Sequence, residues 1–367
     1  MFKRPQQRKL ALLIPAHNEG LVIQDTITSA LRAGLKRRDI YLVSDGSTDD
    51  TVAIATEMLG APNVISVEHS GKAGAVKKAL DHFEIPSRYT WLHIADADSL
   101  FGPGYFKIFK AALDPEKYVA VTGYVQSLPG DWVSKFRVYE YVLAFTIIRR
   151  LQAWFGVITV IPGPTSCLRT DIINQLDFDA GSLTEDFDIT LQIHRKNLGK
   201  IKYVPAAKTY TQDPKNLSDY VQQVSRWYRG FFQGVQDHKL GQPYTFLDAY
   251  VLFMIGQAFL YLAELLIWLP AVAIITRNVA DVSVFFVSEM LVNFLIALMC
   301  AAVADRYDIL VAFPLFYFLQ LVNLFIFVRA FVEVILQKKF RERSAGWSTA
   351  GRRYALTQKS QTNPKGA

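Results

Sequence analysis

Short apolar runs alternate with helix-like segments through the first 125 residues, and this alternation constrains the fold of the 367-residue chain more than any other feature. The apolar, β-rich runs are KLALLIPA, DIYLVSD, NVISVE, TWLHIAD and YVAVTG. Between them, EGLVIQDTITSALRAGL, DTVAIATEMLG and GKAGAVKKALDHF (after its glycines) carry apolar residues at helical spacing. The alternation predicts an α/β fold with a mainly parallel sheet and helices on both faces. In such sheets, ligands bind at the carboxyl ends of the strands.

Polar segments follow the predicted strands at those ends. They are AHNE (16–19), SDGSTDD (44–50), HSGKAG (69–74) and DADS (96–99). Taken alone, DGSTDD is typical of a turn followed by a capped helix, and SGKAG lacks the full spacing of a phosphate loop. In DADS, Asp96 and Asp98 place two carboxylates directly after the strand WLHI. This pair is suited to a hard divalent cation that bridges to substrate phosphates, and the alternative is a solvated pair.

A second acidic group lies in SLTEDFDITLQIHRK (182–196), where Glu185, Asp186 and Asp188 fall within four positions. The segment follows the proline-glycine turn of IPGPTSCLRT and precedes QQVSRW. One interpretation is a solvated helix start, with Thr184 as N-cap and the carboxylates favoured by the helix dipole. The alternative is a catalytic acidic motif, and these residues alone do not decide between the two.

The chain becomes strongly apolar from Thr245 onward, and hydrophobic residues make up 51% of the whole. Stretches 250–276, 282–303 and 309–336 are long enough to span a membrane. Glu264 is costly in lipid, so we expect it to face a polar interior or another helix. The basic segment after Leu336 predicts a cytosolic tail and hence an even number of crossings. One of the three stretches is therefore expected to be re-entrant, interfacial or broken, and Pro314 points to the third.

Charge and cysteine content narrow the class further. The net charge of +7 suits an anionic membrane face or phosphate-bearing ligands better than nucleic acid. The two cysteines, Cys167 and Cys300, do not favour a disulfide framework. The apolar run that ends at Pro15 indicates a first buried strand rather than a signal peptide. Segment 131–160, which contains Arg149 and Arg150, predicts amphipathic helices on the membrane surface or, alternatively, a soluble core helix.

The ordered set PAHNE, DGSTDD, GKAGA, DAD, TED and QVSRW resembles the family 2 glycosyltransferases, inverting enzymes of the GT-A fold, over residues 10–229. With VTGYVQS and GPTSCLR, the chain is similar to the membrane-embedded polysaccharide synthases that make hyaluronan, chitin oligosaccharides or poly-N-acetylglucosamine. Ceramide glucosyltransferases share parts of the set. The resemblance implies a cytosolic, Rossmann-like GT-A domain followed by transmembrane helices.

The resemblance also implies a role for each matching residue. Asp186 corresponds to the catalytic base, and Asp98 to the direct ligand of a magnesium or manganese ion. Substrate-binding roles fall on Ala16, Glu19, Asp45, Lys72, Asp96, Glu185, Gln223, Arg226 and Trp227. Within that set, Asp45 is expected to bind the uracil, Lys72 to lie near the nucleotide, and Trp227 to stack on the acceptor sugar. Thr165 and Ser166 in the GPTSC loop match no single subfamily, which leaves the acceptor sugar open.

The expected organisation is a nucleotide-sugar half (1–125), an acceptor half (126–243), membrane helices (244–336) and a basic cytosolic tail (337–367). In the tail, GWSTAGRR resembles a motif that closes over the active site in hyaluronan synthases. The expected enzyme is a hexosyltransferase of the plasma membrane, multi-pass, with its catalytic domain cytosolic. It would transfer sugar from a UDP-sugar such as UDP-GlcNAc or UDP-Glc to a growing polysaccharide, processively and coupled to export.

Two alternatives remain: a single transfer to a lipid acceptor, and a non-catalytic sugar-nucleotide-binding scaffold. The N-terminal spans usual in the family are missing from this sequence. A second copy of the chain or a partner membrane subunit is expected to supply such helices. Membrane lipids are expected partners, and nucleic acid is not.

Overall fold

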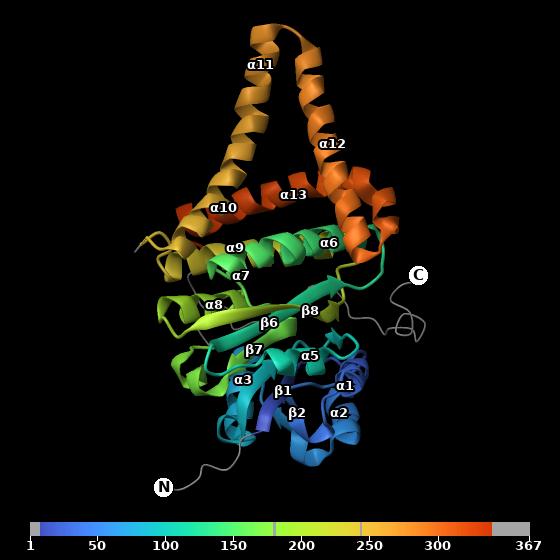
Figure 1. Cartoon of the computed structure of the whole chain (residues 1–367), viewed down its shortest axis with the longest axis vertical. Coiled ribbons are helices and arrows are strands. Elements are labelled where there is room, and N and C mark those ends of the chain that lie inside the picture. Colours follow the sequence, from blue (N-terminus) through green and yellow to red (C-terminus); the bar gives the residue numbers. More distant parts are fainter. Residues whose placement is uncertain (1–7, 179–180, 243, 340–367) are drawn as a thin grey trace.

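An eight-stranded sheet forms the centre of the computed structural model, which describes residues 8–178, 181–242 and 244–339 (Figure 1). The strand order is β3-β2-β1-β4-β7-β6-β8-β5. The strands are β1 (Arg8–Ala16), β2 (Ile40–Asp45), β3 (Val64–Val67), β4 (Tyr89–Ile94), β5 (Leu100–Phe101), β6 (Tyr118–Ser127), β7 (Ser166–Arg169) and β8 (Lys200–Thr211). The strands predicted from the first 125 residues are thus confirmed as β1, β2, β3, β4 and β6.

The sheet is mainly parallel, as predicted. β1 pairs in parallel with β2 and β4, β2 with β3, and β6 with β8. β7 runs antiparallel to both β4 and β6, and the short β5 runs antiparallel to β8. The sheet is therefore a mixed one whose parallel half, β3-β2-β1-β4, ends its strands at the polar segments recognised in the sequence.

Alternate residues of β1 pack into different helical layers. Leu12 and Ile14 join a core with α1 (Ile23–Arg32), α2 (Thr51–Leu59) and α5 (Tyr105–Ala112). Leu13 joins a core with α3 (Gly71–His82) and α4 (Ile85–Arg88). Because successive side chains of a strand point to opposite faces, helices cover both sides of the sheet. The predicted helices at 19–35, 50–60 and 71–83 are confirmed as α1, α2 and α3.

The second half of the sheet domain carries the longer helices. They are α6 (Trp132–Val142), a π-helical turn η3 (Leu143–Ile148), α7 (Arg149–Phe155), α8 (Glu185–Arg195) and α9 (Leu217–Asp237). Short 3₁₀ turns complete the connections at η1 (Arg37–Asp39), η2 (Ala61–Asn63), η4 (Gly163–Thr165) and η5 (Thr170–Gln175). Segment 131–160 is helical as expected, with Phe136 and Val138 buried and Trp154 and Phe155 exposed. Its location at a membrane surface remains a prediction.

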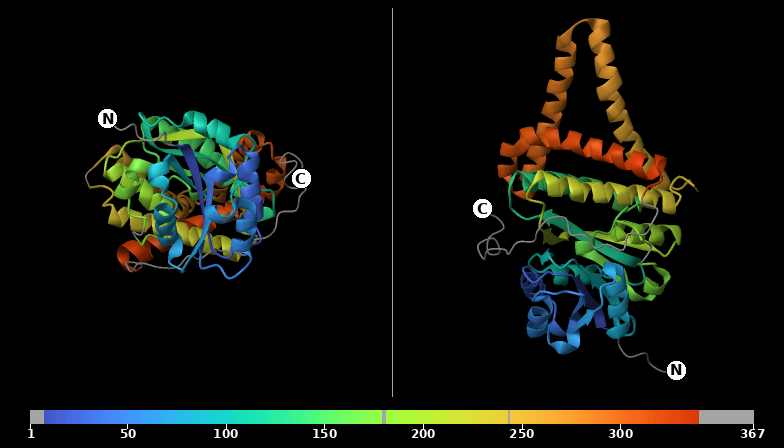
Figure 2. Two further views of the ribbon diagram at one scale, coloured as in Figure 1. Left: turned by 90° about the horizontal axis from the view of Figure 1, so that it is seen from below. Right: turned by 180° about the vertical axis from the view of Figure 1, so that it is seen from behind.

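Three helical segments are long and apolar enough to cross a membrane: Phe246–Thr276, Val282–Ala304 and Tyr307–Leu336, each with mean hydropathy 2.2. They contain α10 (Phe246–Ala263), η6 (Glu264–Trp268), α11 (Leu269–Thr276), α12 (Val279–Ala304), η7 (Tyr307–Ala312), α13 (Phe313–Phe331) and η8 (Val332–Leu336). Figures 1 and 2 show α10, α11 and α12 rising from the sheet domain as a hairpin, while α13 crosses the foot of that hairpin beside α9.

More of the third segment is buried than of the other two, and Pro314 does not break its helix, so its expected departure from a simple crossing stays a prediction. Pro314 lies in the first turn of α13, where a helix needs no proline N–H. Helix α13 packs on α9: the Tyr220 hydroxyl donates to Asn323 at 2.7 Å, and Arg229 pairs with Glu333 at 2.8 Å. In its most apolar part 33% of residues are buried, against 6% and 17% in the other two.

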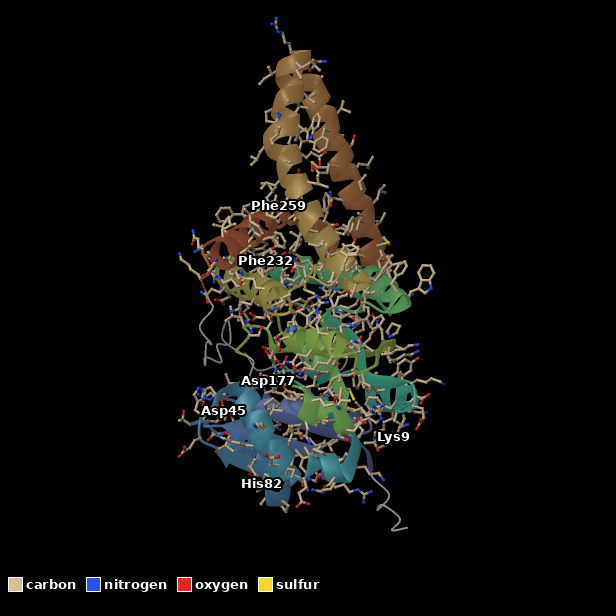
Figure 3. The ribbon with its side chains drawn as sticks, turned by 90° about the vertical axis from the view of Figure 1, so that its left-hand side faces the viewer. Lys9, Asp45, His82, Asp177, Phe232 and Phe259 are labelled. Carbon is tan, nitrogen blue, oxygen red and sulfur yellow. The ribbon has the colours of Figure 1, made fainter. Side chains whose placement is uncertain are left out.

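Glu264 lines a hollow of about 610 Å³ between α10–α11 and α12, together with Gln257, Tyr261 and Phe285. This agrees with the expectation that Glu264 faces a polar interior or another helix. Where the helices meet the sheet domain, Phe232 of α9 and Phe259 of α10 both pack on the Phe331 ring, at 5.5 and 4.9 Å between centroids (Figure 3). The predicted tail motif GWSTAGRR lies outside the described residues.

Candidate active site

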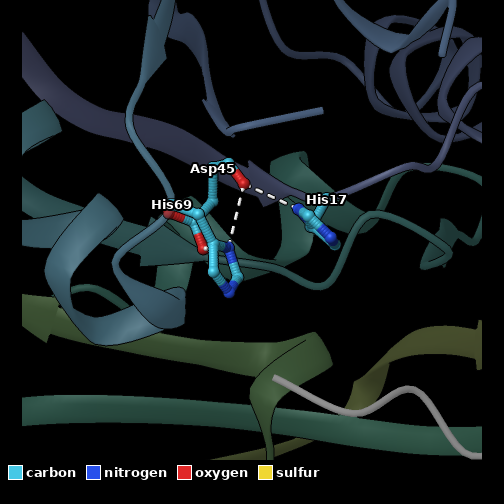
Figure 4. Close-up of side chains that lie close together, drawn as sticks. All are labelled: His17, Asp45 and His69. Atoms are coloured by element: carbon cyan, nitrogen blue, oxygen red, sulfur yellow. Dashed lines mark hydrogen bonds and ion pairs between the residues drawn. The ribbon is translucent and has the colours of Figure 1, made fainter. Parts of the chain in front are cut away.

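Asp45, at the end of β2, forms the floor of the expected base pocket. Its side chain is fully buried, and the Ser70 amide donates to Oδ1 at 2.7 Å. His69 Nδ1 lies 2.9 Å from Oδ2, while His17 Nδ1 lies 2.6 Å from the Asp45 carbonyl oxygen (Figure 4). His69 Nδ1 also hydrogen-bonds the Asp45 carbonyl oxygen at 3.2 Å, and Oδ2 accepts no hydrogen bond from the described residues, so Oδ2 is the oxygen left for a ligand N–H. Sequence reasoning missed both histidines, although each lies in a polar segment that it had singled out.

The remaining residues expected near the nucleoside lie on the neighbouring strand end. Ala16 is the last residue of β1 and is fully buried beside β2. Glu19 is 3% exposed, and its amide donates to Thr51 Oγ1 at 2.8 Å, which ties the loop after β1 to the start of α2. The structure thus brings Ala16, Glu19 and Asp45 to the same end of the parallel strands.

Lys72 connects two acidic motifs that are far apart in the sequence. Its Nζ lies 2.6 Å from Asp96 Oδ1 and 2.6 Å from Glu185 Oε1. Burial alone would lower the pKa of Lys72, but the two carboxylates outweigh burial and raise it well above the usual range. Burial likewise acts to raise the pKa of Glu185, and the Lys72 charge reverses this to a net lowering. Lys72 is therefore a permanent cation that keeps Glu185 ionised and pairs with Asp96.

Asp186 lies next to this cluster and behaves differently. Burial, and then the Glu185 charge, raise the pKa of Asp186 from 3.8 to about 6, although Lys72 opposes the change. It accepts two backbone hydrogen bonds, from Phe187 N to Oδ1 at 2.8 Å and from Gly163 N to Oδ2 at a longer 3.4 Å. A carboxylate of this kind is ionised at neutral pH and has the proton affinity of a useful general base.

The helix-start interpretation explains the position of the acidic segment but not its chemistry. α8 begins at Glu185 with Thr184 at the N-cap position, yet the Thr184 side chain makes no capping hydrogen bond. Asp188 is the structural member of the group: it is 3% exposed, lies 2.6 Å from His238 Nε2, and accepts from Gln192 at 2.7 Å. The three carboxylates therefore have different surroundings.

The loop of GPTSC packs tightly against the acidic cluster. A Cβ on Gly163 would lie 2.7 Å from Asp96 Oδ2, so only glycine permits this approach. The Thr165 hydroxyl lies 3.0 Å from that of Thr122 on β6, which anchors the loop to the sheet. The loop therefore packs directly against the acidic cluster.

The structure places Gln223, Arg226 and Trp227 on α9. The buried Arg137 of α6 donates to Gln223 Oε1 at 2.6 Å, and its guanidinium lies 4.7 Å from the Trp227 ring centroid. Arg226 donates to the Leu183 carbonyl at 3.3 Å and acts electrostatically on Glu185. Arg137 therefore covers one face of the half-buried Trp227. No motif in the sequence pointed to Arg137.

Two glycines set the distance between α9 and α8. A Cβ on Gly230 would lie 2.3 Å from Thr184 Oγ1, and one on Gly234 would lie 2.5 Å from the Phe187 ring. Both distances are shorter than any real contact, so larger residues would push α9 away from the acidic motif.

The residues of the site also fit a divalent cation. Asp96 is engaged by Lys72, whereas Asp98, two residues further along the loop after β4, is 4% exposed. Beside it, Asp213 is 7% exposed and its Oδ2 accepts no hydrogen bond from the described residues. Burial raises the pKa of Asp213 to about 7. Carboxylate oxygens are the ligands that magnesium and manganese prefer, so Asp98 is the residue that would hold the ion.

A mixed, mainly parallel sheet with a buried aspartate at the base pocket and acidic residues at its strand ends defines a GT-A-like domain, the fold of enzymes that use nucleotide sugars. Comparison with known proteins supports this class. The sequence model of the family described as "Glycosyltransferase like family 2" matches residues 5–230. The chain therefore belongs to this family, which confirms the family predicted from the sequence.

Individual relatives are distant. The poly-beta-1,6-N-acetyl-D-glucosamine synthase of Staphylococcus aureus (strain COL) is 25% identical over 228 residues, which is 60% of this chain and 54% of that protein. The synthase of the same name from Staphylococcus epidermidis is 24% identical over 312 residues, 79% of this chain and 73% of that protein. The match thus spans about half the length of the first of these relatives.

A solved structure supports the fold. The mannosyltransferase PcManGT from Pyrobaculum calidifontis, in complex with GDP-Man and Mn²⁺, superposes with a TM-score of 0.52 at 17% identity. The match covers 82% of this chain and 88% of that one. At this identity the likeness establishes the GT-A-like fold.

Proposed function

We propose that this chain is a membrane-bound inverting glycosyltransferase that moves a sugar from a UDP-sugar to a saccharide or lipid acceptor. The observation that carries the proposal is Asp186, a carboxylate with a pKa of about 6 held beside the Lys72–Asp96–Glu185 cluster. Its proton affinity suits removal of a proton from an acceptor hydroxyl near neutral pH.

The donor would lie along the carboxyl ends of the parallel strands. Asp45 Oδ2 offers one acceptor to a base N–H, because Ser70 already donates to Oδ1. The N3–H of uracil fits such an acceptor, and the resemblance of the motifs favours a uridine donor. Ala16 and Glu19 would line the nucleoside, and Lys72 would lie near the diphosphate. A divalent cation held by Asp98 would supply charge neutralisation for that diphosphate.

In the transfer step, the acceptor hydroxyl oxygen forms a bond to the anomeric carbon while the bond from that carbon to the diphosphate oxygen breaks. The diphosphate leaves with the electron pair, and the hydroxyl proton passes to an Asp186 oxygen. Arg226 would oppose the charge that develops on the leaving group. Trp227 would support the acceptor ring, and Gln223 would be held in place by Arg137.

The relatives named as poly-N-acetylglucosamine synthases favour a growing polysaccharide as acceptor, UDP-GlcNAc or UDP-Glc as donor, and processive transfer coupled to export. A single transfer to a lipid is the second candidate, favoured by the apolar helices packed directly on α9. The assay is a donor screen on membranes that contain the full chain, reading UDP release with UDP-GlcNAc, UDP-Glc, UDP-GlcA and UDP-Gal. Product mass separates a polymer from a glycolipid, and no UDP release from any donor would contradict the proposal.

We also propose that α10–α11 and α12 cross the plasma membrane and that α13 lies along its cytosolic face. Two crossings return the chain to the cytosolic side, as the basic tail requires. The tip of the hairpin lies between Thr276 and Val279. A cysteine introduced as Asn278→Cys is then expected to react with a membrane-impermeant thiol reagent outside intact cells. Protection of that cysteine outside, with reaction only after lysis, would overturn the two-crossing topology.

A further inference from the structure

Asp213, just beyond the end of β8, is a buried carboxylate that has no role in the transfer reaction described above. Its residue is 7% exposed, and its Oδ2 atom has no hydrogen-bond partner among the described residues. An ionised carboxylate removed from water is costly unless a positive charge or hydrogen-bond donors compensate it. The position of Asp213 therefore needs a physical explanation.

Strand pairing brings Asp213 to Asp98. β5 runs antiparallel to β8, with Leu100 opposite Tyr210 and Phe101 opposite Thr209. Asp98 lies two residues before Leu100, and Asp213 lies three residues after Tyr210, so both carboxylates emerge at the same end of this pair. They are close enough to interact electrostatically. Two buried carboxylates thus come together where the expected metal ligand lies.

Arg137 compensates the Asp213 charge only in part, because its direct contacts go to other groups. Its Nη1 donates to Glu140 at 2.9 Å and its Nη2 to Gln223 at 2.6 Å, while its guanidinium lies over the Tyr220 and Trp227 rings. It acts on Asp213 through space without forming an ion pair with it. Because the direct ion-pair partner of Arg137 is Glu140, a divalent cation beside Asp98 and Asp213 would add positive charge next to the buried Asp213 carboxylate.

We propose that Asp213 is a second protein ligand, together with Asp98, for the divalent cation of the transfer reaction. The proposal rests on the proposed function and extends it, because the sequence pattern assigned the ion to Asp98 alone. Oxygen ligands from two carboxylates suit magnesium or manganese, which complete their coordination with water and substrate phosphates. In this arrangement β8 and the loop after β4 hold the ion jointly.

The test is Mn²⁺ binding to the full-length chain in detergent or nanodiscs, measured by electron paramagnetic resonance of free Mn²⁺ with and without UDP. Asp213→Asn keeps the shape of the side chain and removes its charge, and we expect the Kd for Mn²⁺ to rise at least tenfold. The matched control is Asp39→Asn, which alters a buried carboxylate that accepts from Tyr89 at the opposite end of the sheet. The control is expected to leave the Kd unchanged.

An unchanged Kd in Asp213→Asn overturns the proposal, whether the melting temperature stays the same or falls. A lower melting temperature with an unchanged Kd would indicate that Asp213 stabilises the fold beside Arg137 and does not bind the ion. If the variant does not fold, the wild-type chain is treated with an apolar carbodiimide and mapped by mass spectrometry. Mn²⁺ must then slow modification of Asp213, and failure to do so also overturns the proposal. None of these readouts needs turnover, so a chain that binds Mn²⁺ in this way but releases no UDP contradicts the proposed function instead.

Discussion

Asp186→Asn separates stability from catalysis more sharply than any other change in the site. The pKa of Asp186 is raised from 3.8 to about 6, so the folded chain binds the proton more tightly than the unfolded chain does. The contribution of Asp186 to the free energy of unfolding is therefore fully present at pH below about 4 and is lost as the pH rises toward 6. At 1.4 kcal/mol per pH unit, the loss at neutral pH is at most about 3 kcal/mol.

Water screens part of this penalty because Asp186 is only half-buried, so we expect about 1 to 3 kcal/mol. Asparagine removes the charge and keeps the shape. The variant should therefore be more stable than the wild type at pH 7 by that amount, which amounts to a rise of a few degrees in melting temperature. The difference should disappear near pH 4. Thermal unfolding of the two proteins across this pH range measures it.

Turnover should move in the opposite direction. Loss of a general base typically lowers the rate by about 10² to 10⁴, and UDP affinity should stay close to that of the wild type. In the wild type, kcat/KM should rise about tenfold per pH unit up to about pH 6 and then level off, because only the ionised form accepts a proton. Asp186→Asn should lose this pH dependence.

Two matched variants test whether Asp186, rather than a neighbouring carboxylate, is the base. Glu185→Gln breaks a pair with Lys72, and Asp188→Asn breaks contacts with His238 and Gln192, so both should lower the melting temperature. If Asp186→Asn retains turnover while one of these variants loses it, the base has been misassigned. If Asp186→Asn lowers the melting temperature at pH 7, the helix-start interpretation of the acidic segment is correct and the electrostatic argument fails.

Three further changes test the walls of the site. Gly230→Ala places a Cβ 2.3 Å from Thr184 Oγ1 and should lower turnover by displacing α9. The control Gly256→Ala, with nothing within 4 Å of its Cβ, should leave turnover unchanged. Equal activities of the two variants would show that the spacing between α9 and α8 does not matter. Trp227→Ala should reduce transfer more than tenfold while UDP binding, followed by calorimetry, survives; normal transfer would remove Trp227 from the acceptor site. Lys72→Met leaves Asp96 and Glu185 without their cation and should lower the free energy of unfolding by about 3 kcal/mol or more. A variant as stable as the wild type would contradict the role of Lys72 as the bridge between them.

The first half of the fold was predictable because its signals are local. Strands β1 to β4 and helices α1 to α3 each show apolar periodicity within a short segment, and the polar ends of those strands mark where a ligand binds. β5, β7 and β8 carry no comparable signal. Their places in the sheet depend on pairing between distant segments, such as β7 between β4 and β6, and periodicity says nothing about partners.

The residues of the candidate site likewise fall into those that the sequence motifs predict and those that only the structure reveals. Motif order was enough to select Asp45, Lys72, Asp98 and Asp186, and the structure brings these residues to one end of the sheet. It was not enough to find Arg137 or Asp213, whose importance comes from burial among elements far away in the sequence. The expectation that the third apolar stretch is not a simple crossing stays a prediction, and the structure adds that α13 packs on α9 while Pro314 leaves the helix intact.

The joint between α9 and α13 has a consequence for how this protein can be handled. On α9, Gln223 and Trp227 contact Arg137, while Tyr220 and Phe232 are completely buried, Tyr220 between α6 and α13 and Phe232 against α13. Truncation of the chain before residue 244 would leave those aromatic rings in water and remove the Arg229–Glu333 pair. The catalytic half is therefore not a detachable soluble enzyme. The packing of α9, which carries Gln223 and Trp227, depends on the detergent or lipid around α13. We therefore expect the measured turnover rate to change with the choice of detergent or lipid.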